Sequence, residues 1–314
     1  MKALQEASPI EGENLQETFL AIVNPAAGGG RGRNLVAPAL ERLRAGGIRI
    51  EIAETSASGH ASVLARDAYA KGYRRFIAVG GDGTSYEIVN GLFPLATDSE
   101  RPTLAFLPLG TGNSFLRDFS GKGVEFALEA LLARRSRTCD VLRLTHATGT
   151  IHYINLLSMG FSADVAALRS RRFDSWGELG YQLSIFLSLL RFRRRPFPVR
   201  VDGDTAADQR PCLFLTFSNS KFTGGTMMIA PQADVSDGLI EYVRWGPIGR
   251  LGLIRNLPTL YDGTHVKHPL AERRPARRVD FQLDAPVDVM VDGEVLTLHC
   301  QTLDVLPSAL NVVV

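Results

Sequence analysis

The sequence predicts an α/β domain with a parallel, Rossmann-like sheet, followed by an antiparallel β-sandwich domain with an inserted helix. Two patterns support this prediction. Before Asp140, apolar runs end in glycine-rich turns and alternate with segments of helical periodicity, as in parallel sheets with crossover helices. After Asp140, short β-rich runs are separated by turns, which is typical of antiparallel sheets. A chain of 314 residues is also long for one hydrophobic core, which favours two domains.

The first domain is expected to contain four strands with helices between them. The helical patterns run from Leu35 to Leu43, from Ser58 to Lys71 and from Thr84 to Leu92. Ser58 is expected to cap the second helix, because a serine oxygen accepts a hydrogen bond from a first-turn amide. The strands are expected at Phe19–Val23, Ile48–Ala53, Phe76–Val79 and Thr103–Leu107.

The second domain is expected to consist mainly of short strands, interrupted by one helical segment at Trp176–Phe192. A basic cluster made of Arg273, Arg274, Arg277 and Arg278 is expected to be a solvated loop. The strands are expected at Val141–Thr145, Ile151–Leu156, Val199–Val201, Leu213–Ser218, Gly238–Val243, Val279–Leu283, Val287–Val291 and Val295–His299.

The change of pattern also predicts the domain boundaries. Residues 1–17 contain acids and no apolar core, so we expect a flexible leader and not a signal peptide. Residues 18–138 are assigned to the first domain and residues 139–301 to the second, and the tail at 302–314 could return to the first domain.

The composition excludes several classes of protein. The net charge is only +2, so we expect no nucleic-acid partner. The cysteines number three and form no CxxC pair, which argues against a disulfide scaffold or zinc site and favours a reducing compartment. No uncharged apolar run approaches the roughly 20 residues of a membrane-spanning helix. We therefore expect a cytoplasmic protein.

Three glycine-rich turns follow predicted strands of the first domain, at residues 24–30, 80–84 and 108–113. The carboxyl ends of parallel strands meet at one edge of a sheet, so these turns should converge on one crevice. Glycine allows backbone amides to approach phosphate oxygens, and the following helix N-termini favour negative charge. One such turn alone would reflect only turn geometry, but three at one edge predict a phosphate site. No GxxxxGK[ST] motif occurs, so the site is not of the Walker type.

The motif Gly80-Gly81-Asp82-Gly83-Thr84, with the Asn-Pro-x-x-Gly turn before it and Gly-Thr-Gly-Asn after it, resembles the diacylglycerol kinase catalytic domain. That superfamily also contains sphingosine and ceramide kinases and, more distantly, NAD kinases and phosphofructokinases. The resemblance extends from about Phe19 to the C-terminus and implies that ATP and Mg²⁺ are the cofactors. It assigns the ATP cleft to Asn24, Pro25, Ala26, Ala27, Gly28, Thr55, Gly81, Asp82, Gly83, Thr84, Ser85, Tyr86, Glu87, Gly110, Thr111, Gly112 and Asn113.

Two segments of the second domain extend the resemblance. Residues 159–165 are similar to the substrate-domain signature of sphingosine kinases, in which the aspartate, here Asp164, contacts the polar head of the lipid. The alternative for Asp164 is a turn or cap. Residues 230–239 are similar to the bacterial lipid-kinase segment that holds a structural magnesium. The resemblance implies the Asp237 carboxylate and the Asp234 and Leu239 carbonyls as ligands, and the alternative for Asp237 is an Asp-Gly turn before a strand.

The resemblance also implies the catalytic residues Asp82, Asp292 and Glu294. In Asp292-Gly293-Glu294, one acid is expected to accept the proton of the attacking hydroxyl, although a hairpin turn is the alternative. The sphingosine-kinase resemblance favours Asp82 as that base, and the diacylglycerol-kinase resemblance favours Asp292 or Glu294. All three acids should face one interdomain cleft.

One position departs from the family pattern. Bacterial diacylglycerol kinases usually carry an acid where this chain has Ser114, so the acid network loses a member unless Asp118 compensates for it. The change favours sphingosine-kinase-like chemistry over diacylglycerol. Asp140 falls where the family has another acid of this network, and it could equally be an aspartate at the start of a strand.

The resulting expectation is an ATP-dependent lipid kinase that acts on diacylglycerol or on a sphingoid base or ceramide. It should contact the membrane peripherally, and a homodimer is a further expectation. The segment Trp176–Phe192, flanked by arginines, could line an acyl-chain pocket or lie at the membrane, or could be an ordinary core helix. The alternatives are an NAD-kinase-like enzyme with a soluble substrate and a nucleotide-binding lipid sensor without activity.

Overall fold

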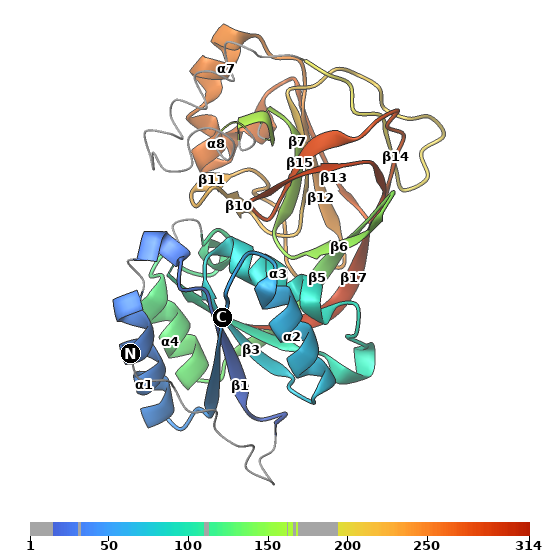
Figure 1. Cartoon of the computed structure of the whole chain (residues 1–314). Coiled ribbons are helices and arrows are strands. Elements are labelled where there is room, and N and C mark those ends of the chain that lie inside the picture. Colours follow the sequence, from blue (N-terminus) through green and yellow to red (C-terminus); the bar gives the residue numbers. More distant parts are fainter. Residues whose placement is uncertain (1–14, 31–32, 110–112, 162, 166–167, 169–193) are drawn as a thin grey trace.

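The computed structural model describes residues 15–30, 33–109, 113–161, 163–165, 168 and 194–314 (Figure 1). The first domain is a parallel sheet covered by helices on both faces, and the second is a β-sandwich. The predicted fold class is therefore confirmed. The expected helix at Trp176–Phe192 lies outside the described residues.

The parallel sheet has the order β2-β1-β3-β4, formed by β1 (Phe19–Val23), β2 (Ile50–Glu54), β3 (Arg75–Gly80) and β4 (Thr103–Pro108). Alternate residues of β1 point to opposite faces, as the pleat of a strand requires. Leu20 and Ile22 pack with α2 (His60–Ala70) and α3 (Asp82–Leu92). Ala21 and Val23 pack with α1 (Arg33–Ala45) and α4 (Val124–Leu132).

Two long antiparallel strands, β5 (Ser136–His146) and β17 (Cys300–Val313), join the two domains. At one end β17 continues the parallel sheet, because Asn311 and Val312 pair with β4. At the other end β17 pairs with β14 (Arg278–Phe281), which pairs with β8 (Val199–Val201), while β6 (Gly149–Tyr153) pairs with β5. One nine-stranded sheet therefore crosses the junction, and the predicted boundaries at 138 and 301 stay a prediction.

The second sheet has six strands in the order β13-β12-β9-β7-β15-β16. It packs on the outer half of the nine-stranded sheet through a core in which Leu142 and Tyr153 meet Leu157, Phe217 and Val291. Its strands are β7 (Leu156–Gly160), β9 (Phe214–Ser218), β12 (Ile240–Trp245), β13 (Ala271–Ala276), β15 (Val287–Val291) and β16 (Glu294–Leu298).

Smaller elements complete the second domain near the junction and at its far end. The hairpin β10 (Phe222–Thr223) and β11 (Met227–Met228) contacts the short 3-10 helix at Phe115–Asp118. The short helix α7 (Arg250–Asn256) lies at the end away from the first domain, and α8 (Thr259–Asp262) lies between α7 and the β10–β11 hairpin (Figure 1). Among the described residues, no helix is both long enough and apolar enough to cross a bilayer.

Two predicted details of the fold are wrong. Ser58 does not cap α2: the helix begins at His60 and its N-cap is Gly59, in the left-handed region at φ 82°. The arginine cluster is not a solvated loop, because Arg273 and Arg274 lie in β13 and form ion pairs with Glu241 and Asp204. Strand pairing with β12 organises this segment in spite of its charge.

Candidate functional site

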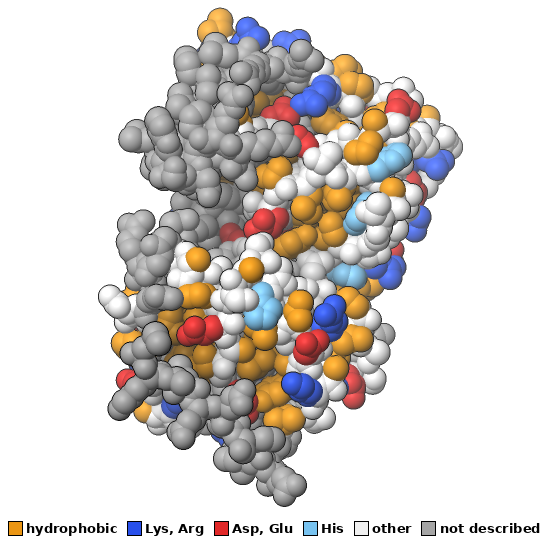
Figure 2. Space-filling view, viewed as in Figure 1, with side chains coloured by type: hydrophobic (Ala, Val, Ile, Leu, Met, Phe, Trp, Pro, Cys, Tyr) orange, Lys and Arg blue, Asp and Glu red, His pale blue; other side chains and the backbone are white. Residues whose placement is uncertain are grey.

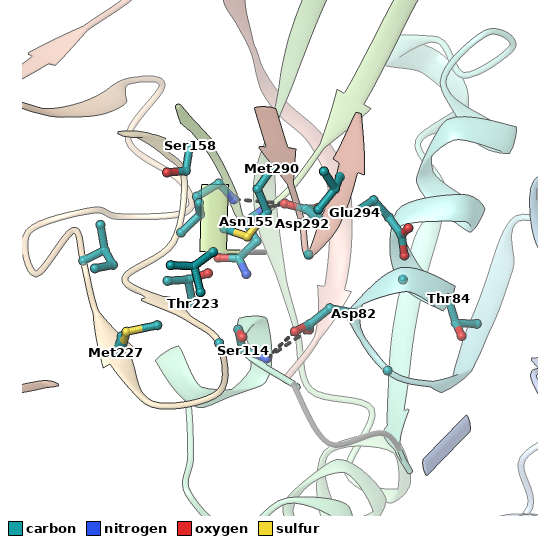
Figure 3. Close-up of a pocket in the computed structure, with 18 of the residues that line it drawn as sticks. Asp82, Thr84, Ser114, Asn155, Ser158, Thr223, Met227, Met290, Asp292 and Glu294 are labelled. Atoms are coloured by element: carbon teal, nitrogen blue, oxygen red, sulfur yellow. Dashed lines mark hydrogen bonds between the residues drawn. The ribbon is translucent and has the colours of Figure 1, made fainter. Parts of the chain in front are cut away.

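A cavity of about 830 Å³ lies between the two domains and is lined by both (Figure 3). The first domain contributes its strand-end turns, at residues 24–28, 55–58 and 81–84, together with Glu87 and Ser114. The second domain contributes polar residues near the junction and a largely apolar wall beyond them. In the space-filling view, acidic side chains lie where the two domains meet (Figure 2). The apolar wall is formed by Phe161, Val165, Leu213, Phe214, Met227, Ile229, Leu253, Leu257, Leu260, Tyr261 and Met290.

The strand-end turns approach one another closely. Gly28 has a φ of 61°, and a Cβ there would come within 2.7 Å of the carbonyl oxygen of Leu109, which follows β4. Residue 28 must therefore be glycine, because the turn after β1 passes close to the turn after β4 there. Thr84 lies in the first turn of α3, and its buried hydroxyl has no hydrogen-bond partner among the described residues. The geometry provides a cradle of amides and one hydroxyl at helix N-termini, which fits phosphate groups.

Asp82 begins α3 at the centre of this cradle. Both of its carboxylate oxygens accept the backbone amide of Ser114, at 2.9 Å each (Figure 3). Burial raises the pKa of Asp82, and the amides of Ser114 and Phe115 oppose that rise. The side chain is thus held firmly beside the positive end of a helix.

The β-sheet of the second domain directs residues alternately to its core and to the cavity. On β7, β9 and β15, residues such as Leu157, Phe217 and Val291 face the sandwich core. Their neighbours face the cavity, because successive side chains of a strand point to opposite faces. The cavity-facing set is Leu156, Ser158, Phe214, Thr216, Met290 and Asp292.

Asp292 follows β15 in a tight turn, with a φ of 47°. Its carboxylate accepts the amides of Ile154, Asn155 and Leu156, at 3.1, 3.1 and 2.9 Å. These three amides turn away from the ladder, so the single strand predicted at Ile151–Leu156 is in fact two strands, β6 and β7. Burial raises the pKa of Asp292 to about 7 against these hydrogen bonds, and the nearby charge of Asp82 adds to the rise.

Glu294 begins β16 and reaches the opposite side of the cleft. A Cβ on Gly83 would lie 2.6 Å from Glu294 Oε1, so the carboxylate rests directly on the turn that carries Asp82. Burial and the charge of Glu87 raise the pKa of Glu294. Within the described part of the chain, no hydrogen bond engages this carboxylate. Glu294 is therefore the cleft acid whose oxygens remain available to a substrate.

Glu87 also lines the cavity, and its carboxylate replaces the missing cap of α2. Its oxygens accept the amides of Gly59 and Ala61 at 2.7 and 3.0 Å. A carboxylate is favoured there by the partial positive charge of the helix N-terminus.

Ser114 and Asp118 connect the cleft to the β10–β11 hairpin. The Ser114 hydroxyl accepts the amide of Gly225 at 3.0 Å, and the Asp118 carboxylate accepts the amide of Lys221 at 3.0 Å. Burial raises the pKa of Asp118 to about 6. Asp118 is not among the residues that line the cavity, so it does not replace the missing acid there.

Asp140 is buried within β5 and serves the domain junction. Its carboxylate accepts the amides of Gly238 and Ser308, each at 2.6 Å. It holds the turn before β12 against the irregular stretch of β17.

The cavity brings together many of the predicted site residues. The residues that line it are Asn24, Pro25, Ala26, Ala27, Gly28, Thr55, Gly81, Asp82, Gly83, Thr84, Glu87, Asp292 and Glu294. Ser85, Tyr86 and Asn113 do not line it, and Gly110, Thr111 and Gly112 lie outside the described residues. Tyr86 packs against the sandwich core, and the Ser85 hydroxyl bonds to the Asp82 carbonyl oxygen.

Asp164 lies apart from the cavity lining, and its carboxylate is bound by Arg195 at 2.7 and 2.9 Å. Asp234 and Asp237 each accept the amide two residues ahead, that of Ser236 and that of Leu239. Burial, and then the charges of Asp234 and Asp140, raise the pKa of Asp237. The roles predicted for Asp164 and for the Asp234–Asp237–Leu239 magnesium site stay predictions.

The apolar wall and Thr216 are not among the site residues predicted from the sequence. The available signal was the alternation in Phe214-Leu215-Thr216-Phe217-Ser218, where every second residue must face away from the core. The helices α7 and α8 gave no signal, because each is shorter than two helical turns.

Comparisons with known proteins agree with this geometry. Residues 18–144 match the model of the diacylglycerol kinase catalytic domain, and residues 155–314 match that of the YegS C-terminal NAD kinase beta sandwich-like domain. A diacylglycerol kinase from Mycobacterium tuberculosis is 28% identical over 299 residues, which is 93% of each chain. A probable lipid kinase, YegS-like, from Chromohalobacter salexigens is 30% identical over 261 residues, which is 82% of each chain.

The fold has relatives among solved structures. A diacylglycerol kinase structure from Bacillus anthracis superposes with a TM-score of 0.69 and covers 95% of this chain and 96% of its own. At 20% sequence identity, this similarity supports the fold alone.

Proposed function

Because this chain belongs to the family of diacylglycerol and YegS-like lipid kinases, we propose that it transfers the γ-phosphate of ATP to the hydroxyl group of a membrane lipid. Family membership makes the chain a lipid kinase. The use of ATP and the class of acceptor are the proposal. The observation that carries it is that one cavity joins a phosphate cradle to an apolar chamber, with three acids between them.

The cradle is the proposed ATP site. Gly28 and Gly83 permit close approach of the backbone, and the unpartnered Thr84 hydroxyl is a ready donor to a phosphate oxygen. In phosphoryl transfer the protein mainly positions the groups and stabilises the spreading negative charge.

Asp82 is the residue that would hold the Mg²⁺ that accompanies ATP, together with the ATP phosphates. The described residues contain no cluster of three or more metal-ligating side chains. Magnesium in such sites is usually held by one or two carboxylates together with substrate phosphates, so this donor set fits it. The ion would neutralise charge on the phosphates.

Glu294 is the proposed acceptor of the proton from the lipid hydroxyl. The oxygens of Asp82 and Asp292 are engaged by backbone amides, whereas those of Glu294 are not, within the described residues. Its raised pKa also brings its basicity closer to that needed near neutral pH. Asp292 would then position the loop at residues 154–156 and contribute negative charge.

The apolar chamber favours a lipid over a dinucleotide as acceptor. Most of its described wall residues, such as Phe214, Leu257 and Met290, are apolar and carry no charge for a second set of phosphates. The test is transfer of radiolabelled phosphate from ATP to a panel of diacylglycerol, ceramide, sphingosine and NAD. We expect labelled lipid and no labelled NADP. Labelling of NADP would support an NAD kinase, and ATP binding without any transfer would support a sensor.

We also propose that α7 is the edge that meets the membrane. Leu251 and Ile254 are 84% and 52% exposed on this helix, whereas Leu253 on its inner side lines the chamber. Arg250 and Arg255 are exposed beside them, and each would contribute about 1 kcal/mol at an anionic lipid surface. Hydrophobic and basic side chains meet at the far end of the second domain (Figure 2). A lipid could pass from the bilayer to the chamber along one helix.

A further inference from the structure

Thr216 lies on the cavity face of the second sheet, one row away from the acids. Pairing aligns Thr216, Ser158 and Met290 across β9, β7 and β15. Leu156, one row closer to the junction, lies beside the turn that carries Asp292. Two residues of strand separate successive rows on one face, so the Thr216 row stands roughly 7 Å from the Asp292 row.

The Thr216 side chain is buried and lines the cavity, yet its hydroxyl has no hydrogen-bond partner among the described residues. The residue is 2% exposed. A buried hydroxyl without a partner costs on the order of 1–3 kcal/mol, so such a group is expected to find a partner when a ligand binds.

The surroundings of Thr216 select a neutral partner. On the cavity face Phe214 lies next to it along β9, and Ser158 is its neighbour on β7 with Met290 beyond. Val243 pairs with it from β12. An ammonium group in this row would lose its hydration without contacting a carboxylate, because Asp292 lies one row away, at roughly 7 Å, and Asp164 is bound by Arg195. A carbonyl oxygen, in contrast, accepts a hydroxyl hydrogen bond at no such cost.

We infer that Thr216 Oγ1 donates a hydrogen bond to the carbonyl oxygen of the ester or amide that links an acyl chain to the lipid's polar head. This rests on the proposed function, since it assumes that the hydroxyl to be phosphorylated lies among the acids. In diacylglycerol and in ceramide that carbonyl is only a few bonds from the hydroxyl. This separation matches the distance of roughly 7 Å between the Thr216 row and the Asp292 row. The subsite therefore favours acylated lipids over a free sphingoid base.

The test compares acceptors that carry this carbonyl with acceptors that lack it. Transfer to diacylglycerol is measured against dialkylglycerol, and transfer to ceramide against sphingosine, for the wild type, Thr216→Val and Thr216→Ser. We expect the wild type to prefer the acylated member of the pair that it uses. Thr216→Val should lower kcat/KM for that member about tenfold, the usual value of one hydrogen bond, and leave the carbonyl-free member unchanged. Thr216→Ser should retain the preference.

Ser218 provides the matched control. It lies on the same strand, and its hydroxyl is also buried and unpartnered among the described residues, but it does not line the cavity. Ser218→Ala should leave the preference intact. A wild-type enzyme that phosphorylates lipids with no preference, or a Thr216→Val variant that keeps it, overturns the inference while the kinase assignment stands. A wild type that labels no lipid at all overturns the proposed function instead.

Discussion

At the scale of single residues, the three acids that meet in the cleft use their oxygens differently. Asp82 binds one amide with both oxygens, and Asp292 binds three amides. Glu294 rests on Gly83 without a hydrogen bond among the described residues. Three carboxylates that look alike in the sequence therefore have different hydrogen-bond partners in the fold. The spacing of Asp292 and Glu294 in the sequence could not reveal this difference.

Asp82→Asn should abolish transfer while leaving the fold intact. The amide keeps an oxygen for the Ser114 amide but loses the charge beside the phosphate cradle, so we expect at least a hundredfold loss of kcat. Steady-state kinetics and thermal unfolding measure the two properties together. Wild-type turnover in a folded Asp82→Asn variant would remove Asp82 from the mechanism.

Asp292 should make stability depend on pH. Its folded pKa of about 7 lies above the ordinary value of 3.8, so the folded state keeps a proton that the unfolded chain releases. This contribution is fully present below about pH 4 and is lost as the pH rises to about 7, with a slope of up to about 1.4 kcal/mol per pH unit. Urea unfolding of the wild type and Asp292→Asn between pH 5 and 8 measures it. If the stability difference between the wild type and Asp292→Asn did not change with pH, the buried environment assigned to Asp292 would be contradicted.

At the scale of elements, α2 depends on a cap from another helix. Glu87→Ala removes both hydrogen bonds to the amides of Gly59 and Ala61, so we expect a loss of about 1–2 kcal/mol in the free energy of unfolding. Ser58→Ala is the matched control, because Ser58 is not the cap and should cost little. Chemical denaturation of both variants measures the free energy of unfolding. Equal losses in the two variants would mean that Glu87 does not cap the helix.

The sequence predicts the helices and strands better than the contacts that stabilise them. Periodicity placed the four parallel strands and the helices α1, α2 and α3 within a few residues, since that information is local, whereas α4 was not predicted. The cap of α2 is supplied by a residue 28 positions away, and no local rule identifies it. The arginines of β13 were misjudged for a similar reason, because their partners Glu241 and Asp204 lie on other segments.

At the scale of the whole molecule, the site exists because two domains share strands β5 and β17. The turns of the first domain could be predicted to converge, since parallel strands end at one edge. The apolar chamber could not, because it is assembled from β7, β9, α7, α8 and the β10–β11 hairpin, which come together only in the folded second domain. The chamber therefore depends on contacts between residues that are far apart in the sequence, which local patterns do not reveal.

The proposed membrane contact of α7 can be tested by replacing an exposed leucine with an acid. Leu251→Asp should weaken binding to vesicles that contain anionic lipid severalfold, since it removes apolar contact and adds repulsion. Leu35→Asp is the control, because Leu35 is 56% exposed on α1 in the other domain. Sedimentation with vesicles measures both, and an equal effect of the two variants would argue against α7 as the contact.

The central claim is that nucleotide and lipid meet within one cavity. The most direct measurement is the structure of the chain with a non-hydrolysable ATP analogue and a short-chain diacylglycerol. We predict the γ-phosphate against residues 81–84, the lipid hydroxyl between it and Glu294, and an acyl chain along the wall that contains Phe214 and Leu257. A lipid bound outside this cavity, or a nucleotide that leaves residues 24–28 and 81–84 untouched, would contradict the account.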